Sequence, residues 1–501
     1  MISHLYRQRI RRSSDRADAG SGGPTRAVVL GGSLAGLLSA RVLADHVDEV
    51  VVVDRDDLDG DSQAARRGVP QGRHTHGLLM RGAEAIEGIV PGFTQGLCER
   101  GALRTDVMSR ARLLMGDNVL ARRPSGLVGI FASRTLIEDE VRRRVREVAG
   151  ISFLGDHDVT GLLATPDRSR VTGALVTARR AGSADAGSPA PVELLADLVV
   201  DATGRGSRAS VWLRELGYQP PEQTEVSAQV LYRTRWFQAR PGVLDDLDGD
   251  VVGTRPSFGR GGVALRQEGD RWAVTLTGQH GEDPPGDLPG FLAYAQTLPT
   301  QGIAQIVAAC PPIGEPLAYR FPTSRWLRWE QLTRRPQGLV VIGDAVCSFN
   351  PIYGQGMSSA AHQAQQLRAL LVHGGTYDLA ARCAAAFAAV VATPWLLATG
   401  ADRRFPGMAP KPLPERLLDR YLDRLLAVAT DDHHVTLAFV RVLNLLAAPS
   451  SLLTPRLAWR VLGPGSIRTV RTAQVSRVAR AATTTRRPPA PTSTPRADVL
   501  Q

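Results

Sequence analysis

The stretch Gly31-Gly32-Ser33-Leu34-Ala35-Gly36 decides how this chain folds. It follows the apolar run 27–30, which predicts a buried parallel strand, and it opens the apolar-rich stretch 34–44, which predicts a helix. A second apolar run, at 50–53, predicts another strand that ends at Asp54. Strand, glycine turn, helix and strand together predict a βαβ unit and therefore the α/β fold class.

The glycine turn has the spacing of a dinucleotide-binding fingerprint, with one departure. Gly31 allows the tight turn and Gly36 allows close packing of helix on strand, whereas Ser33 stands at the position of the second glycine. The N-terminus of the helix is predicted to face a pyrophosphate, and Asp54 stands where a carboxylate accepts hydrogen bonds from ribose hydroxyls. This turn alone does not distinguish NAD from FAD.

Two further turns come much later in the chain, and each follows a predicted strand. The turn Asp-Ala-Thr-Gly-Arg-Gly-Ser-Arg at 201–208 follows the run 198–200, and Gly-Asp-Ala-Val at 343–346 follows the run 339–342. Each turn places glycine and an acidic residue at the carboxyl end of a strand, which is where open α/β sheets bind ligands. A plain NAD dehydrogenase needs neither turn.

With three such turns in this order, the chain resembles the flavin monooxygenases built like p-hydroxybenzoate hydroxylase over most of residues 26–375. The resemblance implies a Rossmann-like FAD-binding domain of the p-hydroxybenzoate hydroxylase and glutathione reductase type. It also implies that Asp344 binds the ribityl chain, that Gly204 meets FAD and passing NAD(P)H, and that Arg134 contacts the ribityl-pyrophosphate region. The segment 349–357 resembles the family's loop beside the isoalloxazine ring.

The residues of that loop suit the implied position. Gly354 and Gly356 permit close approach of the backbone to a flavin. They open a predicted helix at 357–371, and the N-terminal dipole of a helix stabilises negative charge on a reduced flavin.

A finer resemblance is to the flavin epoxidases of polyether-antibiotic pathways, the monensin and lasalocid enzymes, in the stretches 67–76, 201–208 and 349–361. It implies epoxidation or hydroxylation of an olefinic polyketide or terpenoid by one oxygen atom of O2, through a flavin C4a-hydroperoxide. NAD(P)H would reduce the FAD directly or through a flavin reductase. The expected cofactor-binding residues are Gly31, Gly32, Ser33, Leu34, Ala35, Gly36, Asp54, Arg67, Gln71, Arg73, Arg134, Gly204, Gly343, Asp344, Gly354, Gln355, Gly356 and Met357.

The sequence identifies no catalytic acid or base. If a flavin hydroperoxide is itself the electrophile, the protein need only exclude water and position the substrate. His74, His76, Pro351 and Tyr353 are candidates for the flavin pocket without an assigned catalytic role. A lone His-x-His without further ligands nearby is a weak metal signal, so no metal is expected.

The alternating pattern at 226–278 predicts antiparallel strands in a separate sheet, inserted before the flavin domain is complete. Beyond about residue 380 the chain is predicted to be helical and amphipathic. The expected organisation is a disordered basic arm (1–25), a discontinuous FAD-binding domain (26–80, 105–215 and 335–375), a substrate domain (81–104 and 216–334), a helical C-terminal region (376–476) and a disordered tail (477–501).

The amino-acid composition limits which classes of binding partner and which cellular compartment are expected for this protein. The net charge is +11, but the arginines are scattered and aromatic residues make up only 5%, so no nucleic-acid partner is expected. Four widely spaced cysteines indicate a reducing compartment. No apolar run reaches the length of a membrane span and the N-terminus is arginine-rich, so the expected location is the cytoplasm. The expected partners are an apolar small-molecule substrate and O2.

Three other functions are alternatives to a flavin monooxygenase. A flavin halogenase would share the first turn, but the tryptophans of 326–330 have the wrong spacing for that family's WxWxIP motif and no lysine stands in the early flavin domain; we interpret them as packing residues. An FAD-dependent reductase or dehydrogenase of a prenyl-type substrate stays open, because the sequence does not show whether reduced flavin meets O2 or a double bond. A non-catalytic flavin-binding assembly protein also stays open, with the C-terminal helices as its interaction surface.

Overall fold

The computed structural model describes residues 25–58, 66, 68–179 and 190–464. Nearly all of the expected basic arm (1–25) and the whole expected tail (477–501) lie outside the described residues.

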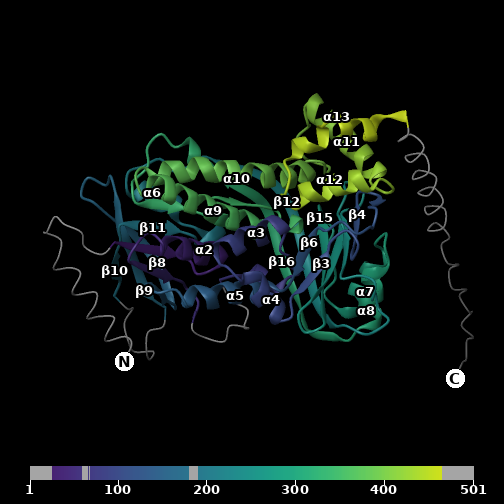
Figure 1. Cartoon of the computed structure of the whole chain (residues 1–501), viewed down its shortest axis with the longest axis horizontal. Coiled ribbons are helices and arrows are strands. Elements are labelled where there is room, and N and C mark those ends of the chain that lie inside the picture. Colours follow the sequence, from purple (N-terminus) through teal and green to yellow (C-terminus); the bar gives the residue numbers. More distant parts are fainter. Residues whose placement is uncertain (1–24, 59–65, 67, 180–189, 465–501) are drawn as a thin grey trace, which may run out of the picture.

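A five-stranded sheet carries the three glycine turns (Figure 1). Its strand order is β17-β11-β1-β2-β7, and every neighbouring pair is parallel. The α/β class predicted from the sequence is therefore confirmed. The strands are β1 (Arg26–Leu30), β2 (Glu49–Val53), β7 (Ile151–Leu154), β11 (Leu198–Asp201) and β17 (Leu339–Val341).

Helices and a small sheet enclose this parallel sheet. The helices are α2 (Leu34–Leu43), α3 (Met80–Ile89), α4 (Phe93–Glu99), α5 (Arg134–Arg146), α6 (Ala209–Glu215) and α9 (Gly356–Gly374). The antiparallel sheet β10-β9-β8 packs against β11 and β1. It comprises β8 (His157–Ala164), β9 (Val171–Ala178) and β10 (Val192–Leu195). The chain thus passes from β10 in this small sheet to β11 in the parallel sheet within a few residues.

A second, larger sheet has the order β18-β16-β12-β15-β14-β13-β4-β5, and all of its pairs are antiparallel except β13 with β4. The strands are β4 (Ala111–Met115), β5 (Asn118–Val119), β12 (Gln223–Gln238), β13 (Gly249–Val252), β14 (Arg260–Gln267), β15 (Arg271–Gln279), β16 (Pro312–Leu327) and β18 (Cys347–Ser348). A short pair, β3 (Leu103–Asp106) with β6 (Val128–Phe131), completes the strands.

Apolar and threonine side chains alternate along part of β15, and this alternation explains how the sheet has an apolar core on one face and a cavity on the other. Trp272, Val274 and Leu276 pack with α7 (Leu288–Gln296) and α8 (Gly302–Ala309) in a buried apolar cluster. Thr275 and Thr277 lie between them in sequence and line a cavity on the other face. Side chains alternate between the two faces of a strand, so one sequence pattern serves both surfaces.

The domain boundaries of the structure differ from those expected in two places. The segment 81–104, assigned from sequence to the substrate domain, forms α3 and α4, which pack against α9 and α5 and share their apolar core. The strands β4 and β5, assigned to the FAD domain, extend the eight-stranded sheet. Both differences arise because strand pairing and helix packing join segments that are distant in sequence.

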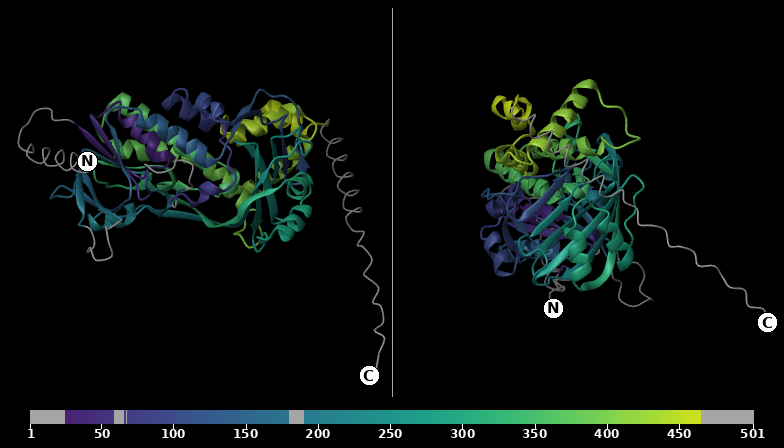
Figure 2. Two further views of the ribbon diagram at one scale, coloured as in Figure 1. Left: turned by 90° about the horizontal axis from the view of Figure 1, so that it is seen from below. Right: turned by 90° about the vertical axis from the view of Figure 1, so that its right-hand side faces the viewer.

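The C-terminal region is helical, as its pattern predicts. It comprises α10 (Leu379–Asp402), α11 (Leu413–Val428), α12 (His433–Leu443), the 3-10 helix η6 (Pro449–Leu453) and α13 (Pro455–Leu462). Helices α11 to α13 lie at the end of the molecule that holds the eight-stranded sheet (Figure 2). They share an apolar cluster with Met108, Leu120 and Leu127.

The long helix α10 is one exception to the expectation that no segment could span a membrane. Among the described residues it alone has the length and apolar composition of a span. It packs against α9 and β17, and Phe387 and Val391 are buried in the main core. The core helix of a soluble protein can have the same length and apolar composition as a membrane-spanning helix. These two properties therefore do not by themselves make α10 a membrane-spanning helix.

We predict that Gly36→Ala destabilises the protein by about 3 kcal/mol, because the added Cβ would lie 1.8 Å from the carbonyl oxygen of Gly31. The matched control is Gly88→Ala on α3, where the nearest atom is 3.5 Å from the added Cβ and an alanine stabilises a helix by up to about 1 kcal/mol. Chemical denaturation measures both. A Gly36→Ala variant as stable as the wild type would contradict this packing.

Candidate functional site

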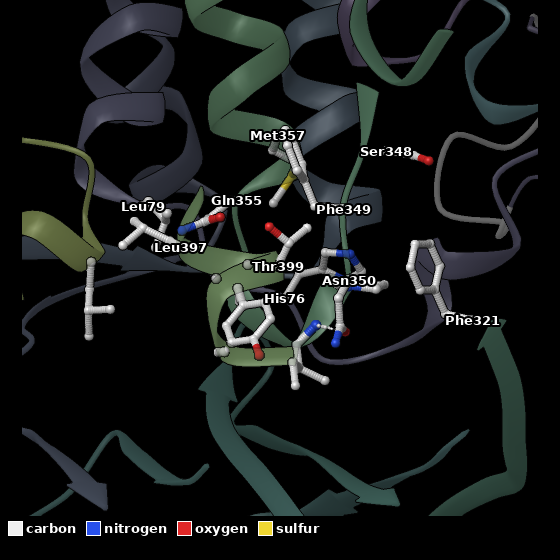
Figure 3. A pocket seen from close by; sticks show the side chains of 18 of the residues that line it. His76, Leu79, Phe321, Ser348, Phe349, Asn350, Gln355, Met357, Leu397 and Thr399 are labelled. Atoms are coloured by element: carbon white, nitrogen blue, oxygen red, sulfur yellow. Dashed lines mark hydrogen bonds between the residues drawn. The ribbon is translucent and has the colours of Figure 1, made fainter. Parts of the chain in front are cut away.

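One large cavity, about 2260 Å³ in volume, lies between the parallel sheet, the eight-stranded sheet and the C-terminal helices. All three glycine turns contribute to its lining. Figure 3 shows side chains from distant parts of the chain around the same space, with His76 from the segment after β2, Gln355 from the loop after the third turn, Met357 from the start of α9, and Leu397 and Thr399 from α10. The cavity is therefore a product of tertiary structure.

The first turn has the geometry that its glycines predict. Gly31 has φ +103°, and a Cβ there would lie 2.5 Å from the carbonyl oxygen of Ala202. The amide of Gly32 donates a hydrogen bond to Oδ2 of Asp54 at 2.5 Å. Ser33 is the N-cap of α2 but does not cap it with its own side chain, so the amides of the first turn remain available for an anion.

Arg66 is a site residue that the sequence interpretation missed. Its guanidinium pairs with Asp54 at 2.7 Å and donates to the carbonyl oxygen of Gly32 at 2.8 Å. The resemblance selected its neighbour Arg67, which lies outside the described residues. Arg66 lines the cavity and is the arginine that the structure places at the first turn.

A buried carboxylate, Glu138, links the first turn to α5. The hydroxyl of Ser33 donates to Glu138, and Arg134 donates to the same hydroxyl at 3.1 Å and lies 3.5 Å from the carboxylate. Burial would raise the pKa of Glu138, but Arg134, Arg66 and the Ser33 hydroxyl hold that pKa below its ordinary value. Glu138 was missed, although its position one helical turn after Arg134 is a signal that places both on one face.

The second turn is held by its own aspartate. The fully buried Asp201 accepts hydrogen bonds from the backbone and hydroxyl of Thr203, at 2.9 and 2.6 Å, and from Ser207 at 2.5 Å. Gly204 follows with φ +73°, and a Cβ there would meet nothing within 4 Å. Asp201 thus fixes the turn, while Gly204 leaves open space in the cavity. Arg205 ties this turn to the third one by donating to Ser348 at 2.7 Å.

The third turn presents a carboxylate to the cavity. Among the described residues no group donates a hydrogen bond to Asp344, which lines the cavity. Burial raises the pKa of Asp344, against the attraction of Arg134, Arg205 and Arg325. Its neighbour Gly343 has φ +72°, and a Cβ there would lie 2.8 Å from the Cβ of Ala35. The first and third turns are therefore in contact, and the Asp344 carboxylate lines the cavity without a hydrogen-bond donor among the described residues.

The loop after the third turn contains the 3-10 helix η5 (Pro351–Tyr353) and then Gly354, whose φ is +67°. No atom lies within 4 Å of a Cβ built on Gly354, so the backbone faces open cavity there. The side-chain oxygen of Gln355 is buried without a hydrogen-bond partner in the described part of the chain. Open backbone and a polar atom without a partner are features of a surface that receives a ligand.

Asp402, the last residue of α10, holds this loop from behind and was not identified from the sequence. One of its carboxylate oxygens accepts from Asn350 at 2.9 Å, Tyr353 at 3.0 Å and Gln279 at 3.4 Å. The other oxygen is buried without a partner among the described residues. Burial raises the pKa of Asp402 to about 6, although these three hydrogen bonds oppose the rise.

Both histidines line the cavity; His74 is buried and His76 is half-buried. His74 Nδ1 lies 2.7 Å from the hydroxyl of Thr234, which lies 2.6 Å from that of Thr275. His76 Nδ1 donates to the carbonyl oxygen of His74 at 2.8 Å. Burial and Arg73 lower the pKa of His74 to about 4, and burial and Arg134 lower that of His76 to about 4. Both rings are therefore neutral at pH 7.

Most of the expected site residues line the cavity, and four of the described ones do not. The lining residues are Gly31, Ser33, Leu34, Ala35, Asp54, His74, His76, Arg134, Gly204, Asp344, Pro351, Tyr353, Gly354, Gln355, Gly356 and Met357. The four others are Gly32, Gly36, Arg73 and Gly343, of which the three glycines act through the backbone. The side chain of Gln71 lies outside the described part. No group of three or more metal-binding side chains occurs among the described residues.

This arrangement fits FAD. The amides at the N-terminus of α2 and the guanidinium of Arg134 have the chemistry that binds a pyrophosphate, and the Asp54 carboxylate has the chemistry that binds a ribose. The Asp344 carboxylate and the open backbone at Gly354 supply a polar acceptor and close approach for the rest of the cofactor.

We predict that Asp402→Asn changes how stability depends on pH. A buried carboxyl whose pKa rises from 3.8 to about 6 contributes stability that is full below pH 4 and is lost as the pH rises through about 6. The asparagine variant, which stays neutral, should gain roughly 3 kcal/mol relative to the wild type between pH 4 and pH 7. Denaturation curves of both proteins across this range measure the difference. A constant difference would show that Asp402 has an ordinary pKa.

Comparisons with known proteins place this geometry in a known fold. p-Nitrophenol 4-monooxygenase PnpA from Pseudomonas putida DLL-E4 matches with a TM-score of 0.58 and 16% identity, over 84% of this chain and 98% of that one. The flavin-dependent brominase Bmp2 matches with a TM-score of 0.59 and 14% identity, over 91% of this chain and 100% of that one. These likenesses show that the chain has the fold of the FAD-binding monooxygenases built like p-hydroxybenzoate hydroxylase, as expected from the sequence.

No protein-family model matches the chain. Protein Rv3254 of Mycobacterium tuberculosis (strain ATCC 25618 / H37Rv) is 32% identical to it over 435 residues, which cover 84% of this chain and 89% of Rv3254. The fold and this extended identity lead to one conclusion: the chain belongs to the family of Protein Rv3254.

Proposed function

We propose that the protein is an FAD-dependent monooxygenase that inserts one oxygen atom of O2 into a bulky, largely apolar small molecule. One observation carries the proposal: three turns from distant parts of the chain line one cavity, and that cavity continues into a mostly apolar chamber. The fold shared with flavin monooxygenases supports the same assignment.

The turns would hold the cofactor at one end of the cavity. The first turn of α2, with Arg66 and Arg134, would bind the pyrophosphate; Asp54 would accept from the ribose, and Asp344 from the ribityl chain. Bound FAD would supply the activation of O2. The protein would bind, orient and exclude water.

The chamber at the other end fits an apolar substrate. Apolar side chains of the eight-stranded sheet, of β6 and of the C-terminal helices line it, among them Leu113, Phe131, Val251, Val263, Leu265, Leu397, Leu422, Leu426 and Phe439. Apolar surroundings bind an apolar molecule and keep water away from the reacting centre. The threonine hydroxyls of β15 and the Tyr319 ring lie between this chamber and the histidines.

Within this function we propose epoxidation of an olefinic polyketide or terpenoid as the first choice and hydroxylation as the second. Oxygen transfer to a double bond needs no general base from the protein. Burial lowers the pKa of both histidines of the pocket to about 4, so each is a weak base, which is consistent with a reaction that needs no strong base from the protein. NAD(P)H would provide the electrons, directly or through a flavin reductase. The four free cysteines suit the reducing conditions of the cytoplasm, the proposed location.

A halogenase is the less favoured assignment, although Bmp2 shares the fold. The tryptophans of the 326–330 stretch are buried, and Trp326 packs against Trp395 at a ring distance of 5.6 Å. The single lysine, Lys411, lines the cavity but its ammonium binds Asp419 at 2.9 Å and the carbonyl oxygen of Gly400 at 2.9 Å. A lysine engaged in this way ties α11 to α10.

The deciding experiment is incubation of the purified protein with NAD(P)H, candidate polyenes and labelled O2, followed by mass spectrometry. We expect one labelled oxygen atom in the product and NAD(P)H oxidation that depends on the substrate. Addition of two hydrogens without label would indicate a reductase. Halide incorporation in the presence of bromide would indicate a halogenase, and an unchanged substrate would favour the non-catalytic alternative.

We predict that Asp344→Ala lowers FAD retention on purification by about tenfold or more, because it removes a charged acceptor that no protein group uses. Asp344→Asn should retain an intermediate fraction. Glu193→Ala, which removes an exposed carboxylate on β10, is the control and should retain FAD as the wild type does. Flavin absorbance per protein measures all three. Equal flavin content in Asp344→Ala and the control would remove Asp344 from the site.

A further inference from the structure

Exposed apolar side chains gather on the C-terminal helices. Leu413 and Leu417 of α11, Leu453 of η6, and Trp459 and Leu462 of α13 are all exposed, with Trp459 at 71%. These elements pack against one another: α13 contacts both α11 and η6. A tryptophan and four leucines on one small subdomain exceed the scattered apolar exposure of an ordinary surface.

Helix α11 carries two stripes of opposite charge, and only one of them has partners. Its acidic residues, spaced four apart, are each paired with the α10–α11 connection: Glu415 with Arg403 at 3.0 Å, Asp419 with Lys411 at 2.9 Å and Asp423 with Arg404 at 2.6 Å. Leu413, Arg416, Leu417 and Arg420 follow the i, i+3, i+4, i+7 spacing of another face. These four residues form the Leu/Arg stripe, whose two arginines have no acidic partner in the described part of the chain.

Helix α13 extends this stripe. Arg424, one turn beyond Arg420, donates to the carbonyl oxygen of Val461 at 2.7 Å and so joins the Leu/Arg stripe to α13. On α13, Leu457 and Val461 are buried, whereas Arg456, Trp459 and Arg460 face outward at i, i+3 and i+4. Leucine, tryptophan and arginine therefore alternate across one joined surface.

The same surface reaches the cavity. Leu396, Leu418 and Leu453 are exposed, and all three also line the cavity. The apolar interior thus meets the solvent where the exposed apolar side chains begin. The sequence that follows α13, residues 465–501, contains seven arginines and one acidic residue and is therefore strongly basic.

We propose that the Leu/Arg stripe of α11, with Leu453, Trp459 and Leu462, docks onto an anionic lipid membrane. Tryptophan and leucine enter the boundary between headgroups and acyl chains, and the unpaired arginines bind anionic headgroups. An interfacial helix combines an apolar stripe with flanking basic residues in this way.

If the protein has the proposed monooxygenase function, membrane docking also indicates the class of its substrate. With the mouth at Leu396, Leu418 and Leu453 against the bilayer, a lipophilic olefin would pass from the membrane into the chamber without crossing water. The substrate would then be a membrane-dissolved hydrocarbon or prenyl-type lipid.

The test is co-sedimentation of the full chain with vesicles of equal parts phosphatidylglycerol and phosphatidylcholine, without substrate. We expect binding that weakens at high salt and is lower on pure phosphatidylcholine. Trp459→Ser with Leu462→Ser should lower the partition constant about tenfold or more. Arg416→Gln with Arg420→Gln should lower it roughly fivefold per arginine at low salt. Circular dichroism and melting temperature verify that each variant is folded.

The matched control is Val372→Ser with Tyr377→Ser, which removes two apolar side chains of similar exposure at the end of α9. It should bind vesicles as the wild type does. Equal loss in control and Trp459 variants, or a wild type that stays in the supernatant, overturns the proposal. A dimer that dissociates in the Trp459 variant overturns it in favour of a second copy. Since no substrate is used, these results leave the oxygenase assignment untouched.

Discussion

The parallel pairing of β1 with β11 and of β11 with β17 is the constraint on which the site depends. Parallel strands end at the same edge of a sheet, so the turns that follow them must meet there. They meet closely: a Cβ on Gly31 would lie 2.5 Å from Ala202, and a Cβ on Gly343 would lie 2.8 Å from that of Ala35. Glycine is required because three chain segments share one small volume.

Buried charge gives this edge its polarity. Asp54 and Glu138 are each paired with an arginine, and these pairs connect the first turn to α5 and to the segment after β2. Buried ion pairs offset a large desolvation cost, so they are poor evidence of stability, but they fix side chains in place. Asp344 differs because none of the described residues donates a hydrogen bond to its carboxylate. A ligand with hydroxyl groups would supply the missing donors.

The C-terminal helices complete the cavity from the opposite side. Asp402 at the end of α10 holds Asn350 and Tyr353 of the loop after the third turn. Helix α10 carries none of the three glycine turns. Through the Asp402 carboxylate it nevertheless holds the loop at the end of the cavity proposed to bind the cofactor. The acidic residues of α11 bind the connection that follows Asp402, and this leaves the arginines and leucines of the same helix at the surface. One helix thus forms part of the chamber and part of the outer face.

The sequence by itself determined the βαβ unit, the three glycine turns and sixteen of the residues that line the cavity. These are local signals: strand and helix periods, tight turns and the acidic residue at a strand end lie within a few residues of each other. It also determined the helical character of the C-terminal region. The spacing of residues along the chain carries all of this information.

Only the tertiary structure decided what depends on contacts between distant segments. The packing of α3 and α4 on the flavin side, the pairing of β4 with β13, and the roles of Arg66 and Asp402 all follow from such contacts. Arg66 reaches Asp54 and Gly32, and Asp402 meets Asn350 across 52 residues. Local sequence patterns do not encode these long-range contacts, because the contacts result from the packing of the whole chain.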